Sequence, residues 1–345
     1  MELDECAAIL YVKDKDSKEE EIKEEYYILK KIGLGGTSIV YLCQSSLDGH
    51  EYALKLYSNI DAYQTETQLL RLIQSSKNIV KLIKSGEGIL ERGNSLDNAS
   101  VADFIGKNSV KFAVFEYLPN GELLEYIDIN KEGFNEKICK NIFRCLIEAV
   151  ELCHISGVVH GDIKLQNIML SENFEIKLID FGFSRLLNNG ELFFQWSGTI
   201  GYSAPETFQS EAHGYNGIKN DIFGLGVVLF MIIFGYSPFS KPAFTDSNYK
   251  LIIKKEYDAF WKQVNKTNIN ISDNLKDLIH KMICFDESSR ISIEEIKAHP
   301  WLFNSNNDSC CDKIVENEDD IEDLYIKELI KRKELIDLNK KDLYE

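Results

Sequence analysis

The stretch His160-Gly161-Asp162-Ile163-Lys164-Leu165-Gln166-Asn167, with Asp180-Phe181-Gly182 shortly downstream, decides how this 345-residue chain folds. Two short apolar segments separate them, the second around residues 176–179, and both are predicted to be strands. Two carboxylates and one carboxamide therefore lie on loops beside strands. Hard oxygen ligands of this kind suit Mg²⁺, which keeps several waters and bridges phosphates. Taken singly, Asp162 could equally be a cap and residues 180–182 a plain turn, so the prediction depends on what accompanies them.

A glycine-rich segment lies far upstream, Gly33-Leu34-Gly35-Gly36-Thr37-Ser38-Ile39-Val40. Glycines allow the backbone to approach phosphates closely and to offer N–H donors. The segment departs from G-x-G-x-x-G because Ser38 stands where the third glycine would be. A strand, not a helix, is predicted to follow. That disfavours a Rossmann or Walker phosphate site, since both end on a helix N-terminus.

A lysine and a glutamate form the next candidate pair. Lys55 closes the apolar strand Tyr52-Ala53-Leu54-Lys55, where a lone lysine is commonly just an edge residue. Glu66 lies on the apolar stripe of a helix predicted over residues 61–74. A carboxylate that faces the core is costly unless it is paired. We expect Lys55 to be its partner, which would keep the lysine ready for phosphate oxygens.

The chain changes character near residue 119. Residues 26–117 contain short strand-like runs and one helical stretch, whereas the residues after Pro119-Asn120-Gly121 are mainly helical. Residues 84–109 are rich in Gly, Ser, Asn and Asp, and they are predicted to form a surface insertion. A small β-rich half therefore precedes a larger α-rich half.

Both ends of the chain are acidic. Residues 1–25 carry 10 acidic and 4 basic side chains and are predicted to be a charged N-terminal arm, with helix expected near its end. Residues 304–345 carry 13 acidic and 7 basic side chains. Within this acidic tail an amphipathic helix is predicted over Asp319–Leu338. It would either dock on its own domain or bind a separate partner, because a short helix needs a packing surface.

Composition argues against several classes of partner. A net charge of −17 disfavours nucleic-acid binding, which needs a basic surface. The longest apolar run, Val227 to Phe234, is too short to span a bilayer. The N-terminus lacks the pattern of a secretory signal. The eight cysteines show no metal-ligand spacing. Several of them, Cys139, Cys145 and Cys153, lie in apolar segments and are expected to be buried, reduced thiols. We therefore expect a cytoplasmic protein that does not bind membranes. The sequence is also compatible with entry into the nucleus.

Taken in order, the motifs resemble those of the eukaryotic protein kinase family. The matches are GLGGTSIV, YALK, HGDIKLQN, DFG and Ala204-Pro205-Glu206, and they are joined by Ser197 to Tyr202, Asp221, Gly224, Gly226, Arg290 and His299-Pro300-Trp301. The resemblance covers residues 26–303. It implies an α+β, bilobal fold: a small lobe (26–117) with an antiparallel sheet and one helix, a hinge (116–121), and a larger, mainly helical lobe (121–303).

The resemblance also implies a role for each site residue. Asp162 would accept the hydroxyl proton of a protein substrate, and Lys164, placed as in serine/threonine kinases, would contact the γ-phosphate. Lys55, paired with Glu66, would bind the α- and β-phosphates of ATP. Mg²⁺ would be held by Asn167 and Asp180. The other positions would surround the nucleotide: Gly33, Gly35, Gly36 and Ser38 in the glycine loop, Val40, Ala53, Phe115 and Met169 around the adenine, Glu116 to Leu118 in the hinge, and Glu122 beside the ribose or a basic substrate residue.

Three departures from the family pattern matter. Gly161 replaces the arginine that commonly grips a phosphate on the activation loop, so we expect activity without loop phosphorylation. Only 11 residues separate Lys55 from Glu66, fewer than is usual. Gln166 and Met231 stand where arginine-directed kinases often carry acids, so a strong preference for arginine before the target residue is not expected.

Two alternatives compete with a protein kinase. A small-molecule phosphotransferase can share the His-Gly-Asp start, but Lys164, the segment before Glu206, and Arg290 indicate a peptide-binding platform. A pseudokinase scaffold typically lacks the lysine, the base or the metal aspartate, and none of these is missing here. A protein serine/threonine kinase that uses ATP and Mg²⁺ is the prediction.

Overall fold

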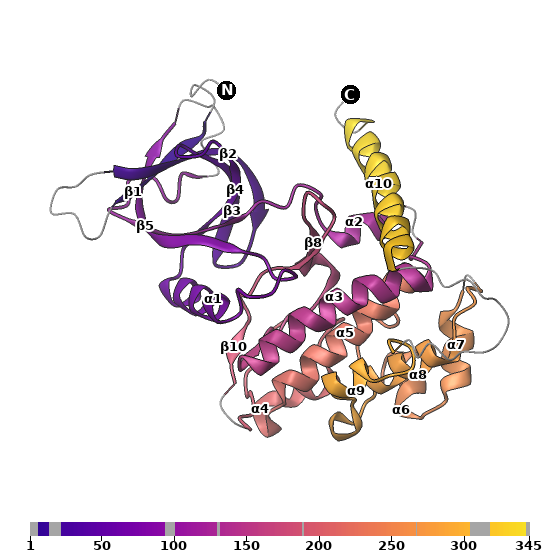
Figure 1. The fold of residues 1–345 in the computed structure, drawn as a ribbon. Coiled ribbons are helices and arrows are strands. Elements are labelled where there is room, and N and C mark those ends of the chain that lie inside the picture. Colours follow the sequence, from indigo (N-terminus) through magenta and orange to yellow (C-terminus); the bar gives the residue numbers. More distant parts are fainter. Residues whose placement is uncertain are drawn as a thin grey trace. The chain divides into compact units, whose positions relative to one another are not determined.

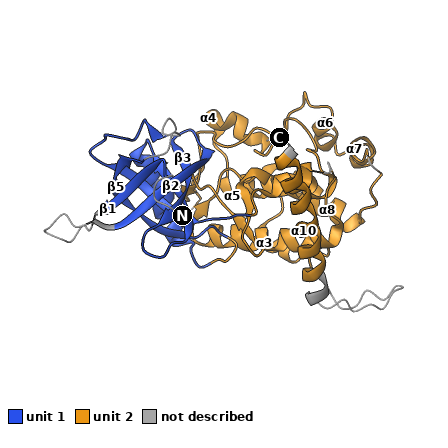
Figure 2. Cartoon of the chain, turned by 90° about the horizontal axis from the view of Figure 1, so that it is seen from above, with its two compact units in different colours: residues 1–75, 79–119 blue, residues 76–78, 120–345 orange. Residues whose placement is uncertain are grey.

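The computed structural model describes residues 6–13, 22–93, 101–129, 132–187, 190–266, 268–303 and 318–342. The chain divides into two compact units, residues 1–75 with 79–119 and residues 76–78 with 120–345 (Figure 2). The first unit is mostly strand and the second mostly helix. The predicted α+β class is confirmed.

Six antiparallel strands form the first unit. They are β1 (Ala8–Lys13), β2 (Ile22–Leu34), β3 (Ser38–Ser45), β4 (Glu51–Tyr57), β5 (Leu82–Arg92) and β6 (Val110–Glu116). Their order is β1-β2-β3-β4-β6-β5, and β1 also pairs with β5 (Figure 1). Leu10 of β1 therefore lies opposite both Tyr26 and Leu90. The sheet thus returns on itself around an apolar core that includes Tyr26, Leu54 and Phe112.

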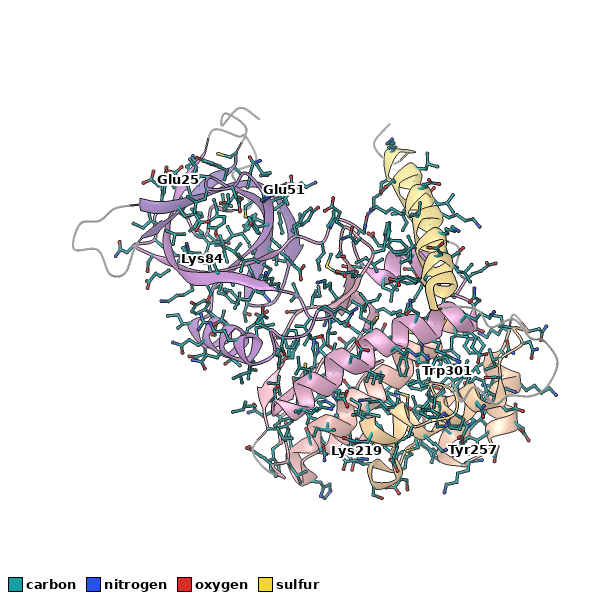
Figure 3. The ribbon with its side chains drawn as sticks, viewed as in Figure 1. Glu25, Glu51, Lys84, Lys219, Tyr257 and Trp301 are labelled. Atoms are coloured by element: carbon teal, nitrogen blue, oxygen red, sulfur yellow. The ribbon has the colours of Figure 1, made fainter. Side chains whose placement is uncertain are left out.

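The predicted acidic arm is wrong for the described part of residues 1–25. Residues 8–13 form β1, and residues 22–25 begin β2. Ala8, Leu10 and Val12 are 0%, 0% and 6% exposed, which is the two-residue period of a strand with one face in a core. The buried Glu24 on β2 forms an ion pair with Lys84 on β5, a residue labelled in Figure 3. Residues 1–5 and 14–21 lie outside the described residues.

The predicted surface insertion at residues 84–109 is also wrong in part. Strand β5 extends through this region to Arg92. Farther along, Val101 and Phe104 are 0% and 2% exposed and pack into the same core as β1. Their apolar side chains outweigh the polar composition around them, since burying a valine and a phenylalanine each contributes about 1.5–3 kcal/mol.

One helix, α1 (Ile60–Leu72), accompanies the sheet, as predicted for residues 61–74. Asn59 caps it by accepting a hydrogen bond from the backbone N–H of Ala62. The helix contacts β4, β5 and β6, and its buried side chains are Glu66, Thr67, Leu69 and Leu70. Glu66 is therefore the charged residue on the inner face of the helix.

Helices dominate the second unit. They are α2 (Leu123–Asp128), α3 (Glu136–Ile155), α4 (Ser210–His213), α5 (Gly217–Phe234), α6 (Tyr249–Ile253), α7 (Tyr257–Val264), α8 (Asp273–Met282), α9 (Ile293–Lys297) and α10 (Glu318–Asp342). Helix α5 contacts both α3 and α8. By length and composition α5 could cross a membrane, but 83% of it is buried inside the protein, as in the core helix of a soluble fold. Trp301 packs edge-on against Phe143 of α3 (Figure 3).

Two short hairpin-like pairings complete this unit. β7 (Val158–Val159) pairs with β10 (Arg185–Leu186), and β8 (Ile168–Leu170) pairs with β9 (Ile176–Leu178). The second pair is the one predicted between the Asp162 and Asp180 motifs. It determines how those two motifs face each other.

The C-terminal helix α10 docks on its own unit, against α2 and α3 (Figure 1). Tyr325, Leu329 and Ile336 are buried, and the Tyr325 hydroxyl donates to the carbonyl of Phe174 at 2.7 Å. The guanidinium of Arg332 donates to three main-chain carbonyls. The predicted amphipathic helix is present, and its buried side chains face its own domain. Residues 304–317 of the predicted tail lie outside the described residues.

Candidate active site

Asp221 of α5 holds the start of the loop at residues 160–167 through hydrogen bonds. The Asp221 carboxylate accepts hydrogen bonds from the backbone N–H groups of His160 at 2.9 Å and Gly161 at 2.8 Å. His154 of α3 contacts the same carboxylate at 2.9 Å. Asp221 is only 1% exposed, and a buried carboxylate needs partners of this kind. The loop therefore has a fixed shape before it reaches Asp162.

Asp162, Lys164 and Thr199 form one hydrogen-bonded group. The Thr199 hydroxyl donates to Asp162 Oδ1 at 2.8 Å, and Lys164 Nζ donates to the other oxygen of Asp162. Lys164 Nζ also lies 3.1 Å from Thr199 Oγ1. The Asp162 carboxylate therefore accepts a hydroxyl at one oxygen and an ammonium group at the other. The structure thus brings the predicted base and the predicted phosphate-binding lysine together.

The pairing of β8 with β9 brings Asn167 and Asp180 to the same end of a hairpin. The N–H of Ile179 donates to the carbonyl of Asn167 at 2.9 Å, and Asp180 is the next residue. Phe181 is fully buried and packs edge-on against His160 at 4.8 Å. His160 also contacts the carbonyl of Ile179 at 3.1 Å. The Asp180 motif is therefore locked to the Asp162 loop through a histidine–phenylalanine contact.

The donor set fits Mg²⁺. The amide nitrogen of Asn167 is committed to the backbone carbonyl of Asp162 at 2.9 Å, so its oxygen is the atom that can face a cation. Among the described residues no three His, Cys, Asp or Glu side chains form a protein-only metal site. A Mg²⁺ ion that also binds phosphates needs only one or two protein oxygen ligands, and Asn167 and Asp180 are the residues that would supply them.

Gly161 is held in a conformation that suits glycine. Its φ is +80°, and a Cβ atom there would lie 2.8 Å from the carbonyl oxygen of Phe183. Most side chains avoid this backbone region. The departure from the family pattern at this position is therefore built into the local backbone.

In the first unit, Lys55 and Glu66 form the predicted ion pair. Lys55 Nζ donates to the two carboxylate oxygens of Glu66 at 2.8 and 2.9 Å. Both residues are buried, at 8% and 3% exposure. The short spacing of 11 residues does not prevent the contact, because β4 ends at Tyr57 and α1 begins at Ile60. Lys55 and Glu66 therefore meet as expected.

Tyr57 joins this pair and was not predicted. Its hydroxyl donates to Glu66 Oε2 at 3.0 Å. Residues two apart on a strand point to the same face, so a polar tip two positions after Lys55 was the available signal.

The glycine loop forms the turn between β2 and β3. Gly35 N–H donates to the carbonyl of Ser38 at 2.8 Å, and Gly33 lies opposite Val40. A Cβ atom at Gly36 would meet nothing within 4 Å, so the packing of the protein does not explain this glycine. Close approach of a phosphate to the backbone would explain it.

The predicted adenine-binding positions lie on neighbouring strands. Ala53 of β4 pairs with Phe115 of β6, and Val40 pairs with Lys55. Leu118 is buried, and the Glu116 side chain accepts from the N–H of Lys81 at 2.8 Å. These residues belong to the first unit.

Two predicted nucleotide contacts belong to the second unit. Glu122 and Met169 form a single β-bridge beside β8. Burial, and then the negative charge of Glu125, raise the pKa of Glu122 above its usual value. The positive charges of Lys340 and Lys164 act against this rise. Glu122 thus lies within electrostatic reach of Lys164 on the catalytic loop.

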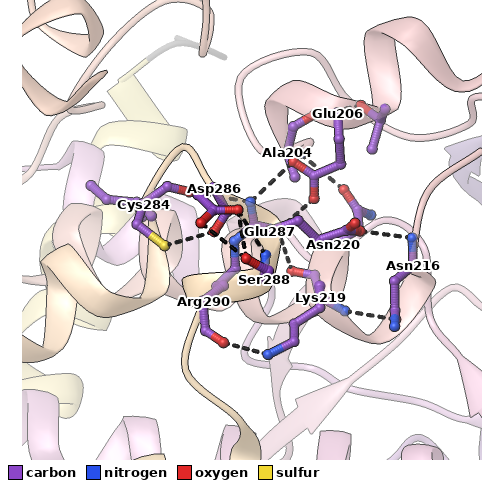
Figure 4. A network of polar contacts seen from close by, with 12 residues as sticks. Ala204, Glu206, Asn216, Lys219, Asn220, Cys284, Asp286, Glu287, Ser288 and Arg290 are labelled. Carbon is purple, nitrogen blue, oxygen red and sulfur yellow. Dashed lines mark hydrogen bonds and ion pairs between the residues drawn. The ribbon is translucent and has the colours of Figure 1, made fainter. Parts of the chain in front are cut away.

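The segment after the Asp180 motif is tied down by Glu206 and Arg290. Arg290 is 2% exposed and donates to the two oxygens of Glu206 at 2.6 and 3.0 Å, within the network drawn in Figure 4. Burial opposes the charge on Arg290, but the hydrogen bonds and charge of Glu206 outweigh it and raise the pKa of the guanidinium. This bidentate pair is implied by the family resemblance. It fixes the position of the segment around Glu206, which follows Thr199.

Of the hydroxyls in this segment, Ser184 is buried at 2% exposure and donates to the carbonyl of His160 at 3.0 Å. Ser197 accepts from Arg185 at 3.4 Å, and Thr199 contacts Asp162. The Ser184 hydroxyl therefore supports the fold, whereas Ser197 and Thr199 lie in the segment that leads to Glu206.

Comparison with known proteins agrees with this geometry. Residues 26–302 match the family model "Protein kinase domain". CBL-interacting protein kinase 26 of Oryza sativa subsp. japonica is 31% identical over 85% of this chain, and the liver/testis gamma catalytic chain of Homo sapiens phosphorylase b kinase is 30% identical over 82%. Serine/threonine-protein kinase SIK1 of Mus musculus is 28% identical over 80%.

The matched regions cover 55%, 67% and 32% of those three relatives, so this chain corresponds to part of their length. The family match spans both the residues that form the lysine–glutamate pair and those that form the catalytic loop. The resemblance predicted from the motifs is confirmed: this chain belongs to the protein kinase family.

Proposed function

We propose that this protein is a serine/threonine protein kinase that transfers the γ-phosphate of ATP to serine or threonine hydroxyls of protein substrates. The observation that carries the proposal is the hydrogen bond from the Thr199 hydroxyl to Asp162 Oδ1 at 2.8 Å. It supports the proposal because the Asp162 carboxylate accepts a hydroxyl hydrogen bond, as it would from a substrate. The names of the similar kinases support the same class of reaction.

Bound Mg²⁺ would neutralise phosphate charge and so make the γ-phosphoryl group easier to transfer. The chain's own residues do the rest. Asp162 orients the acceptor hydroxyl and takes its proton, and Lys164 offers a positive charge beside it. Asn167 and Asp180 supply the oxygens that would hold the ion. Lys55 is kept ready for phosphate oxygens by Glu66. Catalysis of this kind is positioning and charge stabilisation, with little covalent work for the protein.

Two other functions are less well supported. A pseudokinase would not need Lys55, Asp162, Asn167 and Asp180 all to be present, nor the hydrogen bonds that join Lys55 to Glu66 and Asn167 to Asp162. A small-molecule phosphotransferase would not need the buried bidentate pair of Arg290 and Glu206, which supports a platform for a peptide. Protein substrates are therefore the partners that we propose.

The test is phosphate transfer from Mg-ATP to a library of serine-, threonine- and tyrosine-containing peptides, measured with the full chain. We expect transfer to serine and threonine only. Asp162→Asn should lower kcat by at least about a hundredfold, the usual contribution of a general base, with the KM for ATP little changed. Asp323→Asn is the matched control, since its side chain is 76% exposed on α10. Equal turnover by Asp162→Asn and the parent would refute the assignment.

A further inference from the structure

Tyr57, at the end of β4, is a buried tyrosine whose hydroxyl points at the Lys55–Glu66 pair. It is 5% exposed, and its hydroxyl lies 3.0 Å from Glu66 Oε2. Lys55 and Tyr57 project from the same face of β4, because they are two residues apart. The strand therefore presents two donors to one carboxylate.

The Glu66 carboxylate needs both donors. It is 3% exposed, so the hydrogen bonds that water would make must be replaced by protein groups. Lys55 Nζ reaches the two oxygens at 2.8 and 2.9 Å, and the Tyr57 hydroxyl shares Oε2. A lysine is a flexible point charge that does not define the plane of a carboxylate. The Tyr57 hydroxyl is carried on a rigid ring, so the hydrogen bond that it donates to the carboxylate has a fixed direction.

The position of the Tyr57 ring is itself fixed by packing. The ring of Tyr63, on α1, meets it edge-on at 5.4 Å. Lys55 Nζ lies 5.5 Å from the centre of the Tyr57 ring. Tyr63 is in turn contacted by Lys111, whose Nζ lies 5.8 Å from the centre of the Tyr63 ring. Strand β4 and helix α1 therefore hold the hydroxyl in place.

We propose that Tyr57 is a positioning residue that holds the Glu66 carboxylate in the orientation in which it pairs with Lys55. The inference rests on the proposed kinase function and adds a residue to its machinery. When Lys55 also contacts nucleotide phosphates, Glu66 keeps one hydrogen bond that phosphate does not compete for. Tyr57 acts through Glu66 and does not itself touch the reacting atoms.

Reactivity of the Lys55 amine tests this without any substrate. The full chain is treated with an amine-acylating reagent, and the labelling rate of Lys55 is followed by mass spectrometry. Tyr57→Phe removes the hydroxyl and keeps the ring. We expect it to label Lys55 about tenfold faster than the parent, the factor that corresponds to loss of one hydrogen bond to a charged group. Tyr63→Phe is the matched control, since the structure records no hydrogen bond from its hydroxyl, and it should label at the parent rate.

A double-mutant cycle separates positioning from general loosening. Glu66→Ala should label Lys55 quickly, and adding Tyr57→Phe to it should change nothing further, because the hydroxyl would have no carboxylate to hold. Independent effects that multiply in the double variant would overturn the proposal, as would a parent-like rate in Tyr57→Phe.

Kinetics give a second, independent reading. Tyr57→Phe should lower kcat/KM for ATP about tenfold while the KM for the peptide stays unchanged, because Lys55 and Glu66 serve the nucleotide. A change confined to the peptide KM would contradict the proposal. If the parent transfers no phosphate at all, the proposed function fails, whereas the Lys55 labelling rates still decide the role of Tyr57.

Discussion

Replacing Arg332 of α10 by methionine should detach the C-terminal helix from the second unit. Arg332 is 4% exposed and donates to the carbonyls of Tyr126 at 2.8 Å, Glu132 at 3.0 Å and Gly133 at 2.9 Å. It also pairs with Glu328 at 2.7 Å. Methionine keeps most of the length and apolar stem of the side chain, so the substitution removes chiefly the charge and its donors.

The expected loss follows from these contacts. Removing one partner from a buried charged network lowers the stability by about 3–5 kcal/mol, because the acceptors left behind lose their donors where water cannot replace them. The guanidinium also lies 4.0 Å from the centre of the Phe134 ring, and such a cation–π contact contributes about 2 kcal/mol when desolvated. Contributions in one network are not additive, so we expect about 4 kcal/mol in total.

Amide hydrogen exchange measures this locally. Exchange reports the opening of α10 itself, whereas a global unfolding transition reports the chain as a whole. A loss of about 4 kcal/mol corresponds to exchange roughly a thousandfold faster in α10 and in the segment around Gly133, if both open together. Lys331→Met is the matched control, one residue earlier on the same helix and exposed. Exchange in Arg332→Met within about threefold of that control would refute the reasoning.

Three further changes can be predicted. Gly161→Ala should destabilise the second unit by about 2 kcal/mol, since φ is +80° and the new Cβ would lie 2.8 Å from the carbonyl oxygen of Phe183; a melting temperature equal to the parent's would contradict this. Tyr325→Phe should cost about 1 kcal/mol in urea unfolding by removing the 2.7 Å hydrogen bond to Phe174, and an unchanged midpoint would count against that contact. Burial lowers the pKa of His280 from 6.5 to about 4, so the neutral form stabilises the fold above pH 6.5 and this contribution is lost as the pH falls toward 4. His280→Phe should flatten the pH dependence of stability in that window, and a parent-like slope would show that other groups cause it.

The arrangement of the Asp162 loop could be predicted from the sequence because its residues are close together in the chain. Asp162, Lys164 and Asn167 lie within six residues, and a hairpin of two short apolar segments was enough to bring Asp180 beside them. The Lys55–Glu66 pair was predictable for a different reason. A carboxylate on the inner face of a helix requires a partner, and a strand lysine was the available one.

The small sheet was predicted less well. Residues 8–13 carry apolar side chains at Ile9 and Tyr11 as well as on the buried face, so no alternation of polar and apolar residues marks the strand. The acidic residues on either side dominate the composition of the segment. Its structure depends on pairing with β2 and with β5, the second of which lies far along the chain. Local patterns do not contain that information.

Tyr57 and Arg332 were missed for a related reason. Each is a polar group whose partners are supplied by another element, α1 in one case and the segment around Gly133 in the other. Sequence periodicity shows that a side chain faces inward, but it does not show what that side chain meets there. For both residues the hydrogen-bond partner had to be seen.

The doubly paired strand β1 has a consequence for how this protein meets other chains. Sheets attract foreign strands through unpaired backbone N–H and C=O groups on their outermost strands. Here β1 takes up the free side of β2 and the free side of β5 together. Removal of residues 1–21, which include β1, would expose both of these sides at once, so we expect a form without β1 to be more prone to self-association.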